Sequence, residues 1–352
     1  MRIGFVIQHI NAYGGTERAA CAVMNDLAQT DEVHLFEVFS RGPARFGLDP
    51  RIGTTSLFDK HISLLNSWPR LVARMVREIR RHRLDMLVIV ESTHALYGVA
   101  AAKWAGIPCI VWEHFNFSVD LGKRKRRWGR RLAARWANDI VVLTHRDIEL
   151  WEAGVAPRAH LHCIPNIAPP VSSHTYDPSL KTILALGRFV PQKGFDLLVE
   201  AWALVEADPR SEDWRLRIVG DGPDKPGLAA RAKRFRRLEL APSESDVEEL
   251  FAQTGLMVVP SRVEGLPMVM LEAASFGLPM VAFDCLTGPA EVIEDGESGL
   301  LVPPGDVWAL AEALLELMSD ADRRQKMSER AKEKAVDFSK EHVMAVWRAL
   351  LF

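Results

Sequence analysis

Residues 256–283 have the sequence LMVVPSRVEGLPMVMLEAASFGLPMVAF, and this stretch decides the fold class. Two apolar runs, 256–259 and 280–283, flank a segment at 267–277 that has the length and composition of a helix. Short apolar runs that alternate with helices are typical of parallel sheets with both faces covered. The stretch therefore predicts a strand–helix–strand unit of a parallel α/β sheet.

The same alternation runs through the whole chain in two series. Strands are expected at 3–7, 33–39, 86–90, 109–112, 140–143 and 160–165, and again at 182–186, 216–219, 256–259 and 280–283. The stretch 165–178, rich in proline and serine, separates the series because it sustains neither strand nor helix. We therefore expect an α/β protein with two Rossmann-like domains, 1–170 and 171–339, facing each other across a cleft. A last helix at 340–352 either caps the second domain or crosses back to the first.

Composition excludes several classes of protein. Hydrophobic residues make up 48% and charged residues 26% of the chain, which argues against disordered and fibrous proteins. The longest apolar runs are far shorter than the roughly 20 residues of a membrane-spanning helix, and the first residues resemble a buried strand rather than a signal peptide. The four cysteines are widely spaced, which argues against zinc and disulfides and suits the cytoplasm.

Charge is distributed unevenly, and this asymmetry predicts an anionic partner for the first domain. The net charge of −2 is the sum of +7 for residues 1–170 and −9 for residues 171–352. Residues 123–135, KRKRRWGRRLAAR, contain eight cations and no acid, and Trp128, Leu132 and Trp136 fall on one side of the expected helix. This pattern predicts an interfacial helix on an anionic membrane surface or a pyrophosphate-linked acceptor. The expected acceptor or membrane contacts are Thr16, Lys123, Arg124, Arg126, Arg127, Arg130 and Arg131.

The main alternative to a membrane helix is a solvated basic face. The six arginines between Arg70 and Arg83 strengthen the membrane interpretation, but a solvated basic face has the same composition. Nucleic acid is not expected as a partner, because no RNA- or DNA-binding motif accompanies the basic run.

Strand-to-helix junctions are where ligands bind in open parallel sheets. After the first strand, Gly14 and Gly15 allow close approach of the backbone to a ligand, and Thr16 is suited to cap the next helix. The pattern is not GxGxxG, which argues against NAD. In the second series, Gly187, Arg188 and Lys193 lie between a strand and a helix. Two cations beside a helix N-terminus predict a pyrophosphate site.

Two glutamates with E-x7-E spacing follow strand 256–259. Glu264 lies in the loop, and Glu272 follows in the helix. Pro267 is suited to the first helical position, so the amides of Met268 and Val269 point outward toward an anion. Carboxylates that flank such a helix end can accept hydrogen bonds from sugar hydroxyls.

Four motifs in this order resemble the retaining GT-B glycosyltransferases of family 4 (group 1). They are Gly14-Gly15, Gly187-Arg188 with Lys193-Gly194, Val219-Gly220-Asp221-Gly222-Pro223, and the Glu264–Glu272 block, and the similarity covers nearly the whole chain. The resemblance implies that a nucleotide-sugar binds the second domain.

The resemblance implies a role for each motif. Glu272 would hold the ribose, Arg188 and Lys193 the diphosphate, and Glu264 the transferred sugar. Gly14 and Gly15 would approach the reacting centre. The backbone of the loop 265–269 would contact the sugar and the phosphate. Its residues are Gly265, Leu266, Pro267, Met268 and Val269.

Two further segments resemble bacterial members that extend lipid-linked, lipopolysaccharide or exopolysaccharide glycans with UDP-sugars. They are the stretch from Asp284 to Glu291 and Trp112-Glu113-His114-Phe115. His114 follows a strand and is expected to contact the sugar or the acceptor. The segment from Arg237 to Ser245 is shorter than the family's base-contacting region, which leaves the base open.

The sequence thus predicts a metal-independent hexosyl- or N-acetylhexosaminyltransferase that needs no cofactor beyond its nucleotide-sugar. The one D-x-D, at 320–322, lies between two late helices and is interpreted as a solvated helix cap. Retention is implied by the family alone, and front-face displacement follows because no side chain stands out as a nucleophile. The alternatives are a nucleotide-sugar epimerase or hydrolase on the same fold, or a non-catalytic protein that binds glycan or nucleic acid.

Overall fold

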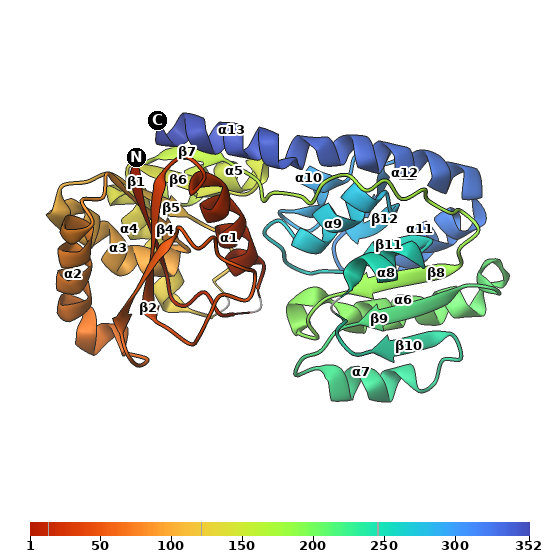
Figure 1. Ribbon diagram of the computed structural model, residues 1–352. Helices are drawn as coiled ribbons and strands as arrows, with labels where there is room; N and C mark the ends of the chain where they lie inside the picture. Colours follow the sequence, from red (N-terminus) through yellow and green to blue (C-terminus); the bar gives the residue numbers. More distant parts are fainter. Residues whose placement is uncertain (13, 121, 245) are drawn as a thin grey trace. The chain divides into compact units, whose positions relative to one another are not determined.

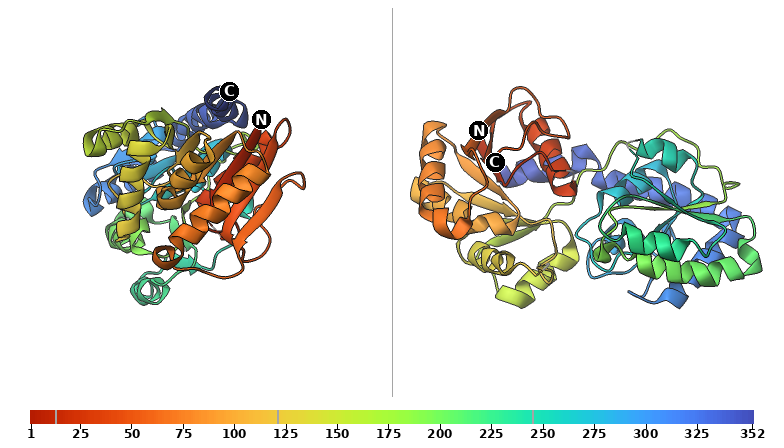
Figure 2. Two further views of the ribbon diagram at one scale, coloured as in Figure 1. Left: turned by 90° about the vertical axis from the view of Figure 1, so that its left-hand side faces the viewer. Right: turned by 90° about the horizontal axis from the view of Figure 1, so that it is seen from below.

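The computed structural model describes residues 1–12, 14–120, 122–244 and 246–352 (Figures 1 and 2). The chain forms two compact units, one of Met1–Asn166 with Val346–Phe352 and one of Ile167–Ala345. Each unit is an α/β layer structure built on its own parallel sheet. None of the described helices is both long and apolar enough to cross a membrane.

The first unit has a seven-stranded parallel sheet with the order β3-β2-β1-β4-β5-β6-β7. Its strands are β1 (Arg2–Ile7), β2 (Glu32–Phe39), β3 (Gly53–Phe58), β4 (Met86–Val90), β5 (Cys109–Trp112), β6 (Asp139–Val142) and β7 (His160–Cys163). The helices that cover them are α1 (Gly15–Leu27), α2 (Leu64–Arg81), α3 (Ser92–Ala105), α4 (Arg124–Trp136) and α5 (His145–Val155). The central strands β4 and β5 are buried along their whole length, as their unbroken apolar runs require.

The second unit has a six-stranded parallel sheet with the order β10-β9-β8-β11-β12-β13. Its strands are β8 (Thr182–Leu186), β9 (Arg215–Val219), β10 (Leu238–Ala241), β11 (Leu256–Val259), β12 (Met280–Phe283) and β13 (Gly299–Val302). Its helices are α6 (Phe195–Ala207), α7 (Lys225–Ala232), α8 (Val247–Ala252), α9 (Met268–Phe276), α10 (Pro289–Val292), α11 (Val307–Ser319) and α12 (Ala321–Ala335), with a 3-10 turn η1 (Pro191–Lys193). This is the doubly wound Rossmann order.

Strand order reverses at one point in each sheet, and this point is where doubly wound sheets bind ligands. In the first unit the reversal lies between β1 and β4, which pair in register from Ile3–Met86 to Val6–Ile89. In the second unit it lies between β8 and β11. The carboxyl ends of these four strands therefore position any ligand site.

All strands expected from the sequence are present, but three further strands were not predicted. They are β3, β10 and β13, and each is an edge strand with one neighbour. An edge strand is partly solvated, so its sequence lacks the long apolar run that identifies a central strand. Strand β10 falls in the segment from Arg237, whose last residue, Ser245, lies outside the described residues.

The C-terminal helix α13 (Lys340–Leu351) contributes its last residues to the first unit. Trp347 is fully buried there, with its ring centroid 4.8 Å from that of Trp112. Arg348 pairs with Asp26 of α1 at 2.9 Å. These contacts fix the end of the chain against the first sheet.

Candidate active site

In the second unit, the loops after β8 and β11 pack backbone against backbone. Gly194 has a φ of +66°, and a Cβ there would lie 1.9 Å from the carbonyl oxygen of Pro260. At the end of β9, a Cβ on Gly220 would lie 1.9 Å from the carbonyl oxygen of Gly187. The glycines of the sequence motifs thus allow these loops to meet at the switch point.

Lys193 and Glu264 form the central ion pair of this site. The Lys193 Nζ lies 2.6 Å from the Glu264 Oε1, which also accepts a hydrogen bond from the Ser261 hydroxyl at 2.6 Å. The Thr287 hydroxyl donates to the Glu264 carbonyl oxygen at 2.6 Å. Both charged side chains remain partly exposed, at 24% and 10%. The structure therefore brings together two residues that lie 71 positions apart in the sequence.

Arg188 is the second cation expected at this site. Its side chain is exposed and forms no hydrogen bond or ion pair with any described residue. Helix α9 begins at Met268 after Pro267, so the first amides of the helix lack intrahelical acceptors. Glu272 lies one turn further along, partly buried. The unit thus offers cations and helix N–H groups to an anion, with carboxylates on either side.

In the first unit, the loop after β1 places Gly14 at the N-cap of α1. We expected Thr16 to be this cap, and that prediction was wrong, because Thr16 is the second residue of the helix. Gly14 is extended there (φ −141°, ψ 159°) and provides no side-chain cap. The glycine pair therefore lies at the carboxyl end of β1, where its backbone borders the switch point.

His114 follows β5 and is buried, with its ring 4.5 Å from that of Trp112. Its Nε2 has no hydrogen-bond partner among the described residues. Burial lowers the pKa of His114 to about 4, so the imidazole is neutral at pH 7. A neutral imidazole can donate or accept one hydrogen bond at this atom, but it offers no positive charge to a ligand.

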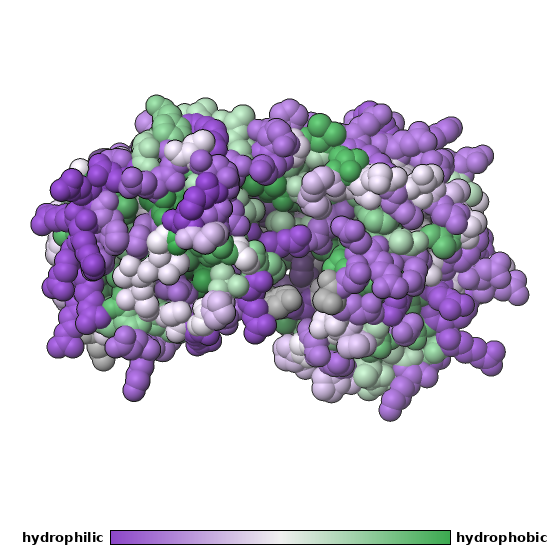
Figure 3. All heavy atoms as spheres, in the orientation of Figure 1, coloured by the Kyte–Doolittle hydropathy of each residue, from purple (hydrophilic) through white to green (hydrophobic). Residues whose placement is uncertain are grey.

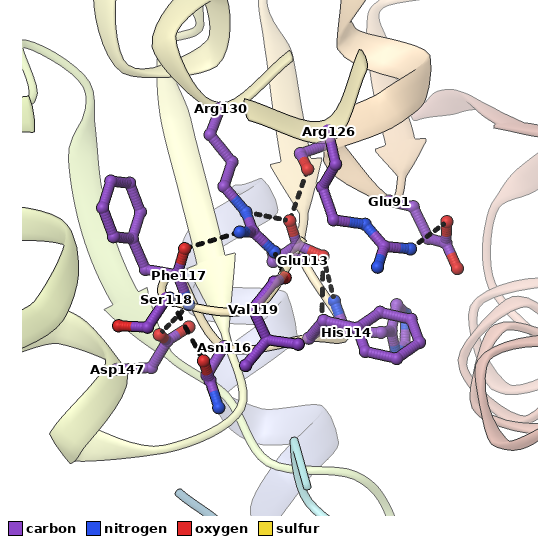
Figure 4. A network of polar contacts seen from close by, with 12 residues as sticks. Glu91, Glu113, His114, Asn116, Phe117, Ser118, Val119, Arg126, Arg130 and Asp147 are labelled. Atoms are coloured by element: carbon purple, nitrogen blue, oxygen red, sulfur yellow. Dashed lines mark hydrogen bonds and ion pairs between the residues drawn. The ribbon is translucent and has the colours of Figure 1, made fainter. Parts of the chain in front are cut away.

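A buried carboxylate, Glu113, organises the loop that carries His114 (Figure 4). It accepts hydrogen bonds from the Arg130 Nε at 3.0 Å, from the Ser92 hydroxyl, and from the backbone N–H groups of His114 and Phe115. Burial would raise the pKa of Glu113, but the nearby Arg130 and Arg126 guanidiniums hold it below its usual value. Glu113 is therefore a charged anchor inside the first unit.

Helix α4 contains the basic run, and its arginines divide between two faces. Arg126 and Arg130 are 2% and 1% exposed, so the prediction that they contact a membrane was wrong. Arg130 donates to the carbonyl oxygens of Phe117 and Val119, the latter at 2.9 Å, as well as to Glu113. Helical spacing puts both arginines, with Gly129 between them, on the face packed against α3.

The other cations that were predicted to contact a membrane or acceptor lie on the exposed face of α4. Lys123, Arg124, Arg127 and Arg131 are exposed, and so are Trp128 and Trp136, at 62% and 50%. The Lys103 Nζ of α3 lies 3.9 Å from the Trp136 ring centroid. Leu132, expected on the same side, is partly buried. Cations and aromatic rings therefore share this face.

Three residues of the first unit were not singled out from the sequence: Glu91, Ser92 and Asp147. Glu91 directly follows β4 and precedes α3, so the junction rule that selected Gly14 and Glu264 would also have found it. Asp147 accepts a hydrogen bond from the Phe117 backbone at 2.7 Å, and burial raises its pKa to about 7. Only tertiary packing reveals the burial of Asp147.

The acidic D-x-D caps a helix, as expected. The Asp320 side chain accepts a hydrogen bond from the Arg323 backbone N–H at 2.8 Å. Within the described residues, no group of three or more His, Cys, Asp or Glu side chains is arranged to hold a metal ion.

Comparison with family models identifies both halves of the chain. Residues 13–170 match the model described as Glycosyltransferase Family 4, and residues 180–320 match Glycosyl transferases group 1. An alpha-D-kanosaminyltransferase of Streptomyces kanamyceticus is 30% identical over 80% of this chain and 81% of its own. The chain belongs to the group 1 glycosyltransferases of family 4.

Other relatives of this glycosyltransferase are bacterial. An uncharacterized glycosyltransferase of Haemophilus influenzae is 28% identical over 99% of both chains. A Campylobacter jejuni alpha-1,4-N-acetyl-D-galactosaminyltransferase, named for a PP-undecaprenol-linked glycan acceptor, is 25% identical over 100% of this chain and 98% of its own. Anabaena HepE, solved with UDP and glucose, shares the fold with a TM-score of 0.80 at 20% identity over 99% of both chains. The fold is therefore GT-B, and the activity is glycosyl transfer.

Proposed function

We propose that this enzyme transfers a hexose or N-acetylhexosamine from a UDP-sugar to a hydroxyl of a lipid-linked glycan, with retention and without a metal ion. HepE binds UDP and glucose, and the Campylobacter relative is named for a glycan on PP-undecaprenol. The observation that carries the proposal is the Lys193–Glu264 pair at the β8/β11 switch point, beside the exposed Arg188. Such cations can neutralise a diphosphate, and such a carboxylate can accept hydrogen bonds from sugar hydroxyls.

The donor would bind with each group opposite its chemical complement. Arg188 and Lys193 would hold the diphosphate, together with the backbone N–H groups of Met268 and Val269 at the start of α9. Glu264 would accept hydrogen bonds from the transferred sugar, and Glu272 from the ribose. When the diphosphate draws the Lys193 ammonium away, the Glu264 carboxylate becomes available to the sugar.

The reaction would then proceed on one face of the sugar. The bond from the anomeric carbon to the diphosphate oxygen breaks, and the bond to the acceptor oxygen forms on the same face. The acceptor proton passes to the leaving diphosphate. The two cations stabilise the charge that builds on this leaving group, and neutral His114 contacts the sugar or the acceptor through a hydrogen bond.

The exposed face of α4 would hold the enzyme at the anionic inner face of the cell membrane. Tryptophans prefer the headgroup region, and each exposed cation near an anionic surface contributes about 1 kcal/mol. Helix α2 adds the exposed Arg70, Arg77 and Arg81, and the surface over it is hydrophilic (Figure 3). The test reverses three exposed residues of this face, Arg124, Lys125 and Arg131, to Glu. This variant should leave anionic liposomes, whereas Lys233, Arg234 and Arg236 reversed to Glu should remain bound.

The activity is tested by a thermal-shift screen of nucleotide-sugars, followed by a transfer assay with lipid-linked acceptors. A UDP-sugar should raise the melting temperature, and a product one sugar longer should form with the anomeric configuration of the donor. Product analysis without acceptor separates transfer from epimerisation and hydrolysis. A screen in which no nucleotide-sugar stabilises the protein would overturn the proposal.

A further inference from the structure

The first unit carries a carboxylate–cation pair at its own switch point. Glu91 immediately follows β4, and the Gly14 loop follows the neighbouring β1. The Glu91 Oε2 lies 3.4 Å from the Arg126 Nη2, which reaches it from α4 (Figure 4). Glu91 thus follows the strand of the first sheet that corresponds to β11, the strand that Glu264 follows in the second sheet, whereas Arg126 comes from α4.

The backbone of Glu91 is strained. Its φ of +67° and ψ of 137° lie in a region that residues other than glycine rarely adopt. The conformation is fixed on both sides, because the Glu91 N–H donates to Trp112 at 2.8 Å and the Glu91 carbonyl accepts from His94 at 3.0 Å. A glycine at position 91 would adopt the same φ and ψ with less backbone strain. The glutamate therefore does not stabilise the fold through its backbone conformation. Strain of this kind collects at functional sites.

The polar side chains around Glu91 do not satisfy all of one another's hydrogen-bond donors. Arg126 is 2% exposed, yet its Nε and Nη1 have no hydrogen-bond partner among the described residues, and its guanidinium lies 4.1 Å from the Phe115 ring centroid. On the same helix, Arg130 uses all three nitrogens. A buried cation with unused donors is costly for the fold and needs another explanation. The Glu91 carboxylate beside it remains 23% exposed.

The chemistry of this group suits an uncharged polyol. Glu91 supplies a hydrogen-bond acceptor, Arg126 supplies donors, and Phe115 an aromatic ring. The negative charge of Glu91 disfavours a phosphate ligand, because the carboxylate would repel it. Vicinal sugar hydroxyls need both acceptors and donors, and this pair offers both.

We infer that Glu91 is an acceptor-binding residue whose carboxylate accepts a hydrogen bond from a hydroxyl of the acceptor's terminal sugar. Arg126 is the positioning residue that orients this carboxylate. The inference rests on the proposed function and deepens it, because it names an uncharged sugar as the part of the acceptor that the first unit recognises.

The test uses a variant that removes both charges, Glu91→Gly with Arg126→Met, so that no buried charge is left alone. Glycine relaxes the backbone, and the melting temperature should equal or exceed that of the wild type. Transfer to an alkyl glycoside acceptor should fall roughly tenfold or more, the loss of one charge-assisted hydrogen bond, with a raised acceptor KM. UDP affinity and acceptor-independent hydrolysis of the UDP-sugar should stay unchanged.

The matched control is Ala156→Gly, which relieves a positive φ of 42° elsewhere in the first unit. It should keep or raise the melting temperature without changing the acceptor KM. Glu91→Gln alone, which keeps the size of the side chain, should also raise the acceptor KM.

Each outcome of this test is informative. Wild-type transfer kinetics in the double variant would overturn the inference, and so would a loss confined to acceptors that carry a phosphate. If the wild type itself neither binds UDP nor transfers sugar, the proposed function fails instead. The two failures are therefore distinguishable.

Discussion

The two switch points of this glycosyltransferase carry similar charges but are built in different ways. In the second unit, two loops that are distant in the sequence pack backbone against backbone through Gly194 and place Lys193 2.6 Å from Glu264. In the first unit, Arg126 reaches Glu91 from the buried face of α4, and neither residue belongs to the four motifs of the resemblance. The pair in the second unit thus lies within recognisable sequence motifs, whereas the pair in the first unit is apparent only from tertiary packing. Substitutions in each unit should show this difference.

The largest expected effect is on stability, at Arg130. Arg130→Met leaves the Glu113 carboxylate buried without its main cation, which should cost about 3–5 kcal/mol of unfolding free energy. Arg126→Met should cost clearly less, because two nitrogens of Arg126 have no partner to lose. Urea denaturation of both variants measures the difference. Equal losses would show that the two arginines are both structural.

The next largest effect is expected on the rate of glycosyl transfer when the cations of the second unit are replaced. Lys193→Ala or Arg188→Ala should lower kcat/KM roughly 10- to 100-fold, because a hydrogen bond to a charged phosphate contributes about 1.5–3 kcal/mol. Folding should be retained, since Arg188 is exposed and Lys193 partly so. Normal turnover in Lys193→Ala would exclude its assignment to the diphosphate.

Substitution of the two glutamates of the second unit should have different effects on UDP affinity. Glu272→Ala should weaken UDP binding roughly tenfold, because it removes a charged acceptor of the ribose hydroxyls. Glu264→Ala should leave UDP affinity unchanged or improved, since it frees Lys193 from its ion pair, and yet it should impair transfer. Calorimetric titration with UDP measures both. A similar loss of affinity in both variants would contradict this division of roles.

The smallest effect is a pH dependence in the first unit, at Asp147. Burial raises its pKa to about 7, above the unfolded value, so the stability that its protonated form contributes is lost as pH rises through 7. Between pH 6 and pH 8 the wild type should lose about 1.4 kcal/mol relative to Asp147→Asn, which cannot ionise. Thermal unfolding at both pH values checks this. Parallel pH profiles would show that Asp147 is ionised throughout.

The sequence predicted the central strands of both sheets from their apolar runs, and its motifs singled out Lys193 and Glu264, which the structure brings together. It missed the edge strands β3, β10 and β13, whose short apolar segments have one sheet neighbour each. It also placed Arg126 and Arg130 on the outer face of α4, because cations line both faces of that helix. Which face is buried depends on Glu113, and the burial of that carboxylate follows only from the packing of α4 on α3.

The central claim is that the nucleotide binds the switch point of the second unit and that the first unit does not contribute to this binding. Calorimetric titration of UDP into the wild type, Lys193→Ala and Glu91→Gln tests it most directly. We predict that UDP binds the wild type and Glu91→Gln equally, and that it binds Lys193→Ala at least about tenfold more weakly. Unchanged affinity in Lys193→Ala, or a comparable loss in Glu91→Gln, would contradict the account.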